Sequence, residues 1–384
     1  MTKTFIALIV VLIVAVGGTT QPAFAVEFAV VGARAAAMGG TGVATTSDAF
    51  AAYWNPAGLA MSKGVDIRVQ GTGQLIDRLG VKDTLDEINS IGTSFGSAGA
   101  AAAAKTRLDA QLAKLSQAGS SVSAIGSAGL YFKTNIGDHA IGFSVSDVAT
   151  GGLFAPSPLS STQTDTTLTI NGQLAAQGLE ARQAALSYAY AFEDRTFALG
   201  ATVKLIQGAA YNASVAVQGT DGDTGFTSDI GKAKISTKLG IDVGAIYRPA
   251  AWLRAGVVAK DINQPAFNAP NGERFKLTPQ VRGGLAINPW ETMTLSVDGD
   301  ITSNKTLVPG QKSRVIGVGA EQTFFSQFIS LRAGAMKNTE DPSSKVMPTG
   351  GLGLRLWVLR MDLGGGYDFQ ERQAMASGTV ALTF

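Results

Sequence analysis

The feature that most constrains this chain is a two-residue alternation of apolar and polar side chains that recurs along most of its length. In the last nine residues, small or apolar positions (Ala376, Gly378, Val380, Leu382, Phe384) alternate with hydroxyl or small ones. Such a segment turns one face to lipid and the other to a polar interior, and lipid admits a β-sheet only when the sheet closes into a barrel. The pattern predicts an all-β fold, a transmembrane antiparallel β-barrel.

Similar segments, many of them long enough to cross a bilayer when tilted, recur from residue 65 onward. Counting them gives about fourteen strands, an even number that suits a closed bacterial barrel. We expect these strands at or around 65–75, 123–134, 141–145, 181–192, 197–205, 235–247, 253–259, 281–287, 292–300, 316–324, 329–335, 352–356, 359–368 and 376–384.

The connections between these segments alternate between tight and long. Bacterial barrels have short periplasmic turns and longer extracellular loops, so an even strand count places both termini in the periplasm. The tight connections fall at 135–138, 193–194, 249–251, 289–291, 326–327 and near 358. Aromatic residues gather around them, which predicts an aromatic girdle at one membrane interface. Its members are Tyr131, Phe132, Phe192, Tyr247, Trp252, Trp290, Phe324, Phe325, Phe328, Trp357 and Phe384.

The amino terminus has the pattern of a signal peptide covering residues 1–25. Lys3 precedes an apolar run, and Ala23 and Ala25 form an A-x-A cleavage signal before Val26. No other segment has eighteen uninterrupted apolar residues, so no transmembrane helix is expected in the mature chain. These facts alone fit a soluble periplasmic protein as well as a barrel, and the strand pattern favours the barrel. The carboxyl-terminal Phe384 resembles the signal by which outer-membrane barrels are recognised for insertion.

Composition supports a membrane barrel and argues against other classes. Charged residues make up 16% of the chain, against roughly 25% in soluble domains. A charge on the lipid face costs about 2–4 kcal/mol at mid-depth, and the 47 glycines ease strand bending and close contact with a plug. The 31 basic and 29 acidic residues nearly cancel, so nucleic acid is not an expected partner. With no cysteine and a single histidine, His139, we expect no metal and no cofactor.

A Gly- and Ala-rich stretch precedes the first predicted strand and lacks the two-residue alternation. Fourteen strands enclose a lumen too wide for their own side chains to fill. We therefore expect residues 26–63 to form a hatch or plug inside the lumen and residues 64–384 to form the barrel. In this stretch Asn favours a turn, Pro56 fixes its own φ, and the residue before it is kept out of the helical region, which makes a rigid corner. An ordinary loop without a functional role explains a single Asn-Pro dipeptide equally well, but the position before the first strand favours the hatch.

The motif Asn55, Pro56, Ala57, Gly58 resembles the hatch motif of the fatty-acid-channel (FadL-like) superfamily of outer-membrane transport proteins. In that superfamily an amino-terminal hatch with an Asn-Pro-Ala motif precedes a fourteen-stranded barrel. A wider string resembles still more closely the TraF-type conjugal-transfer branch and related barrels of secretion systems. That string comprises Gly32-Ala33-Arg34, Met38-Gly39-Gly40-Thr41-Gly42, Asp48 and Tyr53-Trp54. The resemblance implies hatch-gated entry of hydrophobic molecules, with a lateral opening near the third strand.

An insertion at 83–119, between the first two strands, has a helical pattern. Leu108, Leu112 and Leu115 recur at helical spacing, and Gly119 can end the helix. The turn assignment places this insertion in the first extracellular loop. Its apolar stripe is expected either to cover the barrel mouth, contact a ligand or dock a partner, or to pack against the barrel's own loops. Its position favours the TraF-type branch over the fatty-acid channels.

Signals for catalysis are weak, and we predict that the protein is not an enzyme. The G-x-S-x-G match at 92–96 follows no buried strand and has no well-placed later His. The glycine runs at 40–42 and 364–366 lack the context of phosphate loops. Inward carboxylates have inward arginines as ion-pair partners, so a charge ladder lining the lumen is the better interpretation. The carboxylates are Asp298, Asp300, Glu321 and Asp362, and the bases are Arg254, Arg282, Arg332, Arg355 and Arg360.

The sequence therefore predicts a channel in the bacterial outer membrane for passive, hatch-gated uptake of hydrophobic small molecules such as long-chain fatty acids. The alternative is a non-transporting barrel component of a conjugation or secretion apparatus. Expected partners are outer-membrane lipid and lipopolysaccharide, the barrel-assembly machinery during biogenesis and a hydrophobic ligand; the alternative adds conjugation or secretion proteins. A plug opposes the free diffusion of a general porin.

Overall fold

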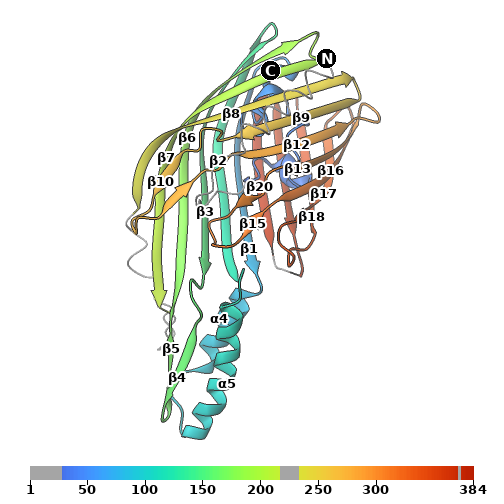
Figure 1. Ribbon diagram of the computed structural model, residues 1–384. Helices are drawn as coiled ribbons and strands as arrows, with labels where there is room; N and C mark the ends of the chain where they lie inside the picture. Colours follow the sequence, from blue (N-terminus) through green and yellow to red (C-terminus); the bar gives the residue numbers. More distant parts are fainter. Residues whose placement is uncertain (1–27, 217–232, 371–372) are drawn as a thin grey trace.

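The computed structural model describes residues 28–216, 233–370 and 373–384, which form a closed antiparallel barrel (Figure 1). Among these residues fourteen strands make up the wall, and β20 pairs with β1 to close it. The predicted signal segment, with Ala23 and Ala25, lies outside the described residues. The predicted fold class is confirmed. In order around the barrel the strands are β1 Asp66–Arg78, β2 Ser121–Ile136, β3 His139–Phe154, β6 Gln173–Phe192, β7 Phe197–Ala216, β8 Lys234–Ala250, β9 Leu253–Lys260, β12 Gln280–Ile287, β13 Met293–Asp300, β16 Val315–Phe324, β17 Ile329–Asn338, β18 Met347–Leu356, β19 Leu359–Tyr367 and β20 Ala374–Thr383.

The two ends of the barrel differ in their connections. Tight turns join β2 to β3, β6 to β7, β8 to β9, β12 to β13, β16 to β17 and β18 to β19, at the positions predicted from the sequence. We call this the turn end; Phe384 also lies there, with its backbone paired to that of Val65. In the described parts of its long connections, the opposite loop end carries three small hairpins (Figure 1). They are β4 Ser160–Thr164 with β5 Thr167–Asn171, β10 Ala266–Asn268 with β11 Arg274–Lys276, and β14 Asn304–Lys305 with β15 Lys312–Ser313.

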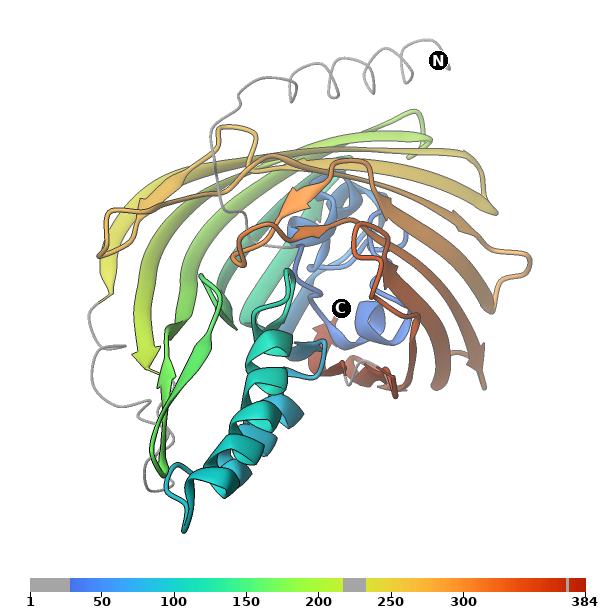
Figure 2. The same cartoon turned by 60° about the horizontal axis from the view of Figure 1, so that its bottom comes forward.

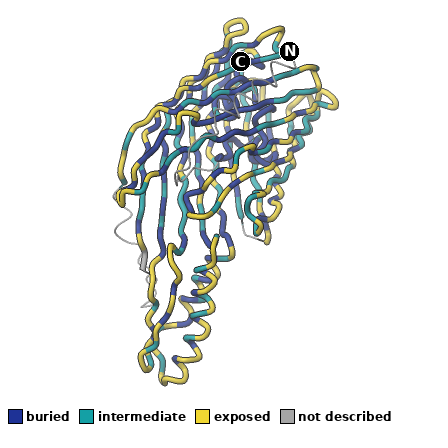
Figure 3. The backbone as a smooth tube through the Cα atoms, viewed as in Figure 1, coloured by how far each residue is buried: buried dark blue, intermediate teal, exposed yellow. Residues whose placement is uncertain are grey.

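Along the wall strands, exposed and buried side chains alternate as predicted (Figure 3). On β20 the side chain of Val380 is 51% exposed, whereas that of its neighbour Thr379 is 4% exposed. On β19 the outward Leu363 is 67% exposed, and the next residue but one toward the turn, Met361, also faces out. The outer face is therefore apolar and the inner face polar or small, as a lipid-embedded barrel requires.

The aromatic girdle is present at the turn end, with one correction. Trp252, Trp290, Phe325 and Trp357 are exposed there, as predicted. Tyr131 does not belong to the girdle: it is fully buried and points into the lumen. It lies next in sequence to the outward Leu130, so the alternation of the strand turns it inward.

An arm projects from the loop end (Figures 1 and 2). It has two halves, the helices α4 Val81–Ile91 and α5 Ala98–Leu115 and the β4–β5 hairpin that packs beside them. The predicted helical insertion between the first two strands is confirmed, but it is two helices, because the chain from Gly92 to Ser97 is extended enough for Ser94 to bridge to Thr167. None of the helices in the described part of the chain is long and apolar enough to span a membrane.

The leucine stripe of α5 is covered by the arm itself. Leu108, Leu112 and Leu115 are buried in one cluster with Leu159 and Leu168 from the hairpin side. Of the two expectations for this stripe, packing against the barrel's own loops is the one that the structure shows. The helix ends at Leu115, before the predicted Gly119.

We predict that replacing Leu363 by Arg, at the middle of the lipid-facing side of β19, destabilises the barrel in phospholipid vesicles by about 2–4 kcal/mol. Phe325→Arg, at the turn, is the matched control and should cost about 0–1 kcal/mol, because the charge reaches the interface. Equilibrium unfolding in urea, followed by tryptophan fluorescence, measures both. Equal costs would contradict the assignment of this face to lipid.

Candidate functional site in the barrel lumen

The amino-terminal residues 28–61, which we call the lumenal segment, lie inside the barrel (Figure 2). They contain two short helices, α2 Ala33–Ala37 and α3 Ala51–Trp54, and the 3-10 helix η1 Pro56–Met61. Helix α2 contacts β17 to β20, whereas η1 contacts β6 to β8. The segment therefore bridges two separate arcs of the wall, and its side chains are largely buried (Figure 3).

Glycines on the inner face of the wall let the backbone of the lumenal segment come into direct contact. At Gly319 an added Cβ would lie 2.5 Å from both the Cβ and the carbonyl oxygen of Met38. The same holds around the wall, where an added Cβ would collide with the lumenal segment at Gly200, Gly244, Gly256, Gly317, Gly334, Gly351 and Gly364. Part of the high glycine content thus shapes a seat for this segment.

The motif Asn55–Gly58 forms the predicted corner and also ties the segment to the wall. Asn55 is fully buried in an extended conformation, and its Oδ1 accepts a hydrogen bond from the N–H of Ala57 (3.2 Å), which caps η1. Its Nδ2 donates to the carbonyls of Ala245 on β8 (3.1 Å) and Val257 on β9 (3.3 Å). Pro56 begins η1, as its fixed φ favours. A side chain at Gly58 would collide with the Thr46 carbonyl.

Two charged wall residues satisfy backbone groups of the lumenal segment. Asp298 on β13 accepts hydrogen bonds through Oδ2 from the N–H groups of Gly42 (2.6 Å) and Val43 (2.8 Å). Lys133 on β2 donates from Nζ to the carbonyls of Ser47 (2.9 Å) and Leu59 (3.0 Å) in the segment and to that of Ser62 (2.8 Å) just after it. Sequence reasoning missed Lys133, and its inward parity on β2 is the one signal that could have found it.

A chain of ion pairs links the lumenal segment to the wall. Arg34 lies 2.6 Å from Glu321, which lies 2.7 Å from Arg332, and Arg332 lies 2.7 Å from Asp362. Burial lowers the pKa of Arg34, but the charge and hydrogen bond of Glu321, together with the charges of Asp48 and Asp362, outweigh this effect and raise the pKa, so the guanidinium stays ionised.

A second pair within the wall joins Arg282 to Asp300 at 2.6 Å. The predicted charge ladder is therefore present in two places, at Glu321, Arg332 and Asp362 and at the pair of Arg282 with Asp300. It is wrong for Asp298, which binds backbone N–H groups instead. Of the remaining predicted bases, Arg254 donates to the Ala44 carbonyl (3.3 Å).

Near the loop side of the segment, cations face aromatic rings. The Nζ of Lys260, at the end of β9, lies 3.1 Å from the ring centroid of Tyr53 and 4.5 Å from that of Phe28. The guanidinium of Arg282 lies 4.1 Å from the Phe28 centroid. Such contacts are attractive, and more so when shielded from water. They were not predicted, because the facing register of β9, β12 and the segment is not visible in sequence.

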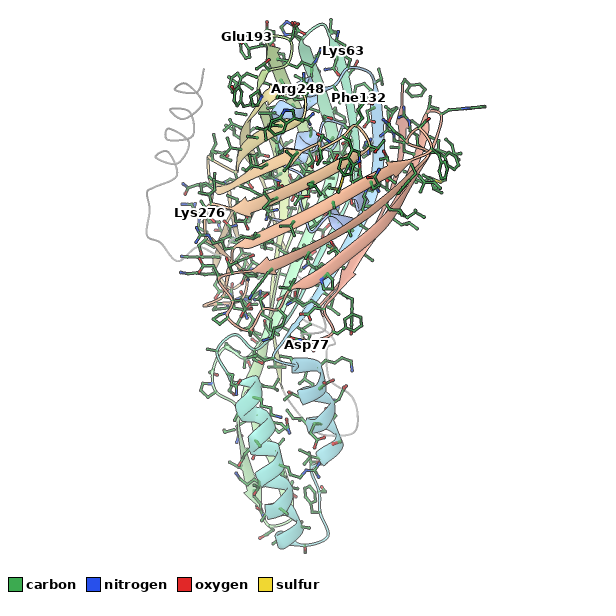
Figure 4. The ribbon with its side chains drawn as sticks, turned by 90° about the vertical axis from the view of Figure 1, so that its right-hand side faces the viewer. Lys63, Asp77, Phe132, Glu193, Arg248 and Lys276 are labelled. Atoms are coloured by element: carbon green, nitrogen blue, oxygen red, sulfur yellow. The ribbon has the colours of Figure 1, made fainter. Side chains whose placement is uncertain are left out.

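A cavity of about 400 Å³ lies at the turn end, between the lumenal segment and the wall. Its lining, among the described residues, includes eight basic and five acidic side chains. The bases are Arg34, Lys63, Arg68, Lys133, Arg254, Arg332, Arg355 and Arg360, and the acids are Asp48, Asp66, Glu291, Glu321 and Asp362. Figure 4 shows Lys63 at this end, far from Asp77 at the base of the arm. The cavity is polar and carries an excess of positive charge.

The wall is closed at the third strand. β3 pairs with β2 from Ser121 to Ile136 and with β6 along the same length. The lateral opening near the third strand, which the resemblance implied, is therefore not seen in this structure. A shallow hollow of about 670 Å³ lies on the outer face of β20, β1, β2 and β3, where the residues are small.

The remaining enzyme-like signals do not come together. Ser94 of the G-x-S-x-G match lies in the arm, at the loop end. His139 lies at the turn end, where its Nδ1 is 2.7 Å from the hydroxyl of Tyr188. The two residues are at opposite ends of the molecule and form no dyad.

Comparisons with known proteins agree with this architecture. Residues 52–300 match the family model "F plasmid transfer operon, TraF, protein", and residues 18–77 match that of "Type IX secretion system protein PorV". No match was found among curated proteins.

Solved structures of channels have a similar fold. The CymD monoaromatic hydrocarbon channel has a TM-score of 0.60 at 13% identity, covering 94% of this chain and 99% of that one. The Ralstonia pickettii toluene transporter TbuX has a TM-score of 0.57 at 15% identity, covering 93% of this chain and 99% of that one. A Pseudomonas aeruginosa FadL homologue has a TM-score of 0.54 at 12% identity, covering 96% of this chain and 99% of that one.

The fold is thus that of the FadL-like barrels, with fourteen strands around an amino-terminal segment. Because the TraF family model matches well over half of its length, the chain belongs to the TraF family. The resemblance stated from residues 32–58 is confirmed for the TraF family, and the FadL-like channels share the fold.

We predict that Gly319→Ala destabilises the protein by about 1–3 kcal/mol and loosens the lumenal segment, because the new methyl group overlaps Met38. Gly71→Ala is the matched control: an added Cβ there meets nothing within 4 Å, so the change should stay within about 0.5 kcal/mol. Urea unfolding gives the stability, and trypsin cleavage after Arg34 reports the loosening. Faster cleavage in both variants, or in neither, would contradict the seat.

Proposed function

We propose that this protein is an outer-membrane channel for the passive uptake of hydrophobic small molecules, gated by the lumenal segment. The observation that carries the proposal is a closed, lipid-compatible barrel whose lumen is filled by its own amino-terminal segment. The fold similarity to TbuX, a toluene transporter, and to a FadL homologue supports it. In this proposal residues 26–63 are the hatch, the turn end faces the periplasm and the arm lies outside the cell.

The barrel gives such a gate a physical basis. A lumen enclosed by fourteen strands is wide enough to pass solutes when empty. Here the segment packs closely against wall glycines. Hydrogen bonds of Asn55, Asp298 and Lys133 connect it to the wall. Each of these ties is buried, so breaking one without replacement costs about 1–3 kcal/mol. Because these contacts are costly to break, we expect a molecule to enter when the segment rearranges locally beside them, and not by diffusing freely past an open segment.

Within this proposal, long-chain fatty acids are one substrate class and monoaromatic hydrocarbons are another. The fold is shared with channels titled for aromatic hydrocarbons, and the sequence motif resembles the fatty-acid channels. Both classes are largely hydrophobic and small enough to pass a barrel of this size, so both are used as probes below.

We predict that cells producing the full chain take up labelled oleate or toluene several-fold faster than cells with an empty vector. Asn55→Ala removes the ties to β8 and β9, so this variant should also admit a hydrophilic antibiotic that intact outer membranes exclude. Asn171→Ala, an exposed amide in the arm, is the matched control and should behave as the unaltered chain. Uptake equal to the empty vector for both probes would overturn the transport proposal.

The second candidate is a non-transporting component of a conjugation or secretion apparatus. It is favoured by the match to the TraF family model over residues 52–300 and by the projecting arm. The apolar stripe of α5 is covered, so a partner would meet a polar surface that carries exposed ion pairs such as Lys82 with Asp86 and Arg107 with Glu87.

This candidate predicts that the full chain, cross-linked in outer membranes of cells with a conjugation system, purifies with stoichiometric partner proteins. Removing both halves of the arm, residues 80–119 and 157–171, should abolish the association and lower the transfer frequency while leaving the barrel folded. A full chain that always purifies alone, from cells whose transfer frequency is unaffected by the deletion, would exclude this function.

A further inference from the structure

Two arginines face each other directly at the turn end of the inner wall. The hairpin of β18 and β19 turns at Trp357, and its register places Arg355 opposite Arg360. Both side chains line the polar cavity. Like charges at directly opposed positions of a sheet repel each other, so this arrangement is unfavourable unless something else lies between or beside them.

The carboxylates around the cavity are mostly engaged with other cations. Asp362, the acid nearest to Arg360 along β19, is bound by Arg332 at 2.7 Å. Asp66 and Asp48 are bound by Arg68, at 2.7 Å and 3.2 Å.

The last two acids do not balance the pair either. Glu321 is shared between two arginines of the ion-pair chain, Arg34 and Arg332. Glu291 is exposed in the turn between β12 and β13. The cavity as a whole thus keeps an excess of three positive charges, larger than the net charge of +2 for the whole chain.

The hydrogen-bonding capacity of the arginine pair is also incompletely used. Arg355 donates from Nη1 to the Oε1 of Gln327 at 2.6 Å. The Nε of Arg360 is buried, and none of the residues that the structure describes supplies it with a hydrogen-bond partner. A buried donor without a partner is costly, and a guanidinium presents a planar fork of donors that matches an oxyanion. Arg254 also lines this cavity, and its hydrogen-bond partner among the described residues is the neutral Ala44 carbonyl.

We propose that this cavity is an oxyanion-binding site, in which Arg355 and Arg360, together with Arg254, bind a carboxylate or phosphate group. The volume of about 400 Å³ accommodates such a group with its water. The bound anion relieves the repulsion between the two arginines and supplies an acceptor for the buried Nε of Arg360. The site goes beyond the proposed channel function, because the anion would bind whether or not the protein transports a substrate.

The anion has two sources with the same chemistry. It is either a small soluble oxyanion that enters from the turn end, or the carboxylate head group of an amphiphile that has passed along the lumen. Inorganic phosphate represents the first source and octanoate the second. Octanol has the same chain as octanoate without the charge, and serves as the neutral control.

The test is isothermal titration calorimetry on the full chain in non-ionic detergent, with the ionic strength held constant by chloride within each titration and raised from one titration to the next. We expect saturable binding of phosphate, octanoate or both, weakening as salt is raised, and weakened by about tenfold or more in R355Q/R360Q. R182Q, which removes an exposed arginine from β6, should bind as the unaltered chain. Binding of phosphate identifies a free oxyanion, whereas binding of octanoate alone identifies an amphiphile head group.

Thermal unfolding provides a second measurement. The double variant loses the like-charge pair, so without added anion its Tm should equal or exceed that of the unaltered chain, and the rise of Tm with anion should disappear. If the double variant does not form a barrel, R254Q alone should show the weakened binding. No saturable binding of either anion, equal binding in the variants, or binding of octanol equal to that of octanoate would overturn the proposal. Each of these results is independent of whether the channel transports anything.

Discussion

The hydrogen-bonded seam between β1 and β20 is the constraint on which the rest of the structure depends. An open sheet edge in lipid leaves N–H and C=O groups unpaired, at several kcal/mol each. Ten register pairs, from Asp66 with Thr383 to Leu75 with Ala374, remove that edge. The hydroxyl of Thr383 also donates to Asp66 at 2.6 Å. Because the seam joins the first wall strand to the last, the strands can cross lipid only as one closed unit.

Closure creates a second requirement, which is to fill the lumen. The lumenal segment does so with helices of four to six residues, too short to satisfy their own backbone groups. The wall supplies the missing partners: Asp298 accepts from backbone N–H groups, and Lys133 donates to carbonyls. Wall glycines supply the space. The segment is therefore folded by the barrel, and its irregular course is a consequence of the surface that it meets.

This division explains what the sequence could and could not predict. The number of strands and the tight turns follow from the local sequence pattern and were predicted. The strand bounds were predicted less well: β3 and β7 extend far beyond the predicted 141–145 and 197–205, because the alternation weakens toward the loop end. The partners of Asn55, at Ala245 and Val257, are about two hundred positions away and depend on the register of two strands. The outward assignment of Tyr131 was wrong because its nearness to a turn was weighed without its parity on β2. The leucine stripe of α5 was recognised, but the hairpin that covers it was not distinguished from a loop.

The cations on the inner face of the wall show the same logic and one exception to it. Arg282, Arg332 and Lys204 each lie within 2.8 Å of a carboxylate. Lys133 has carbonyl oxygens and Lys260 has aromatic rings, so each is compensated by another kind of partner. Arg360 differs, because it faces a second arginine and keeps a buried Nε without an acceptor among the described residues. Folding alone gives no reason to place two cations in register at a cavity, since a neutral pair would close the same hairpin at lower cost. The repulsion between Arg355 and Arg360 therefore stays uncompensated where the lumen meets the turn end, and the proposed anion is the partner that would offset it.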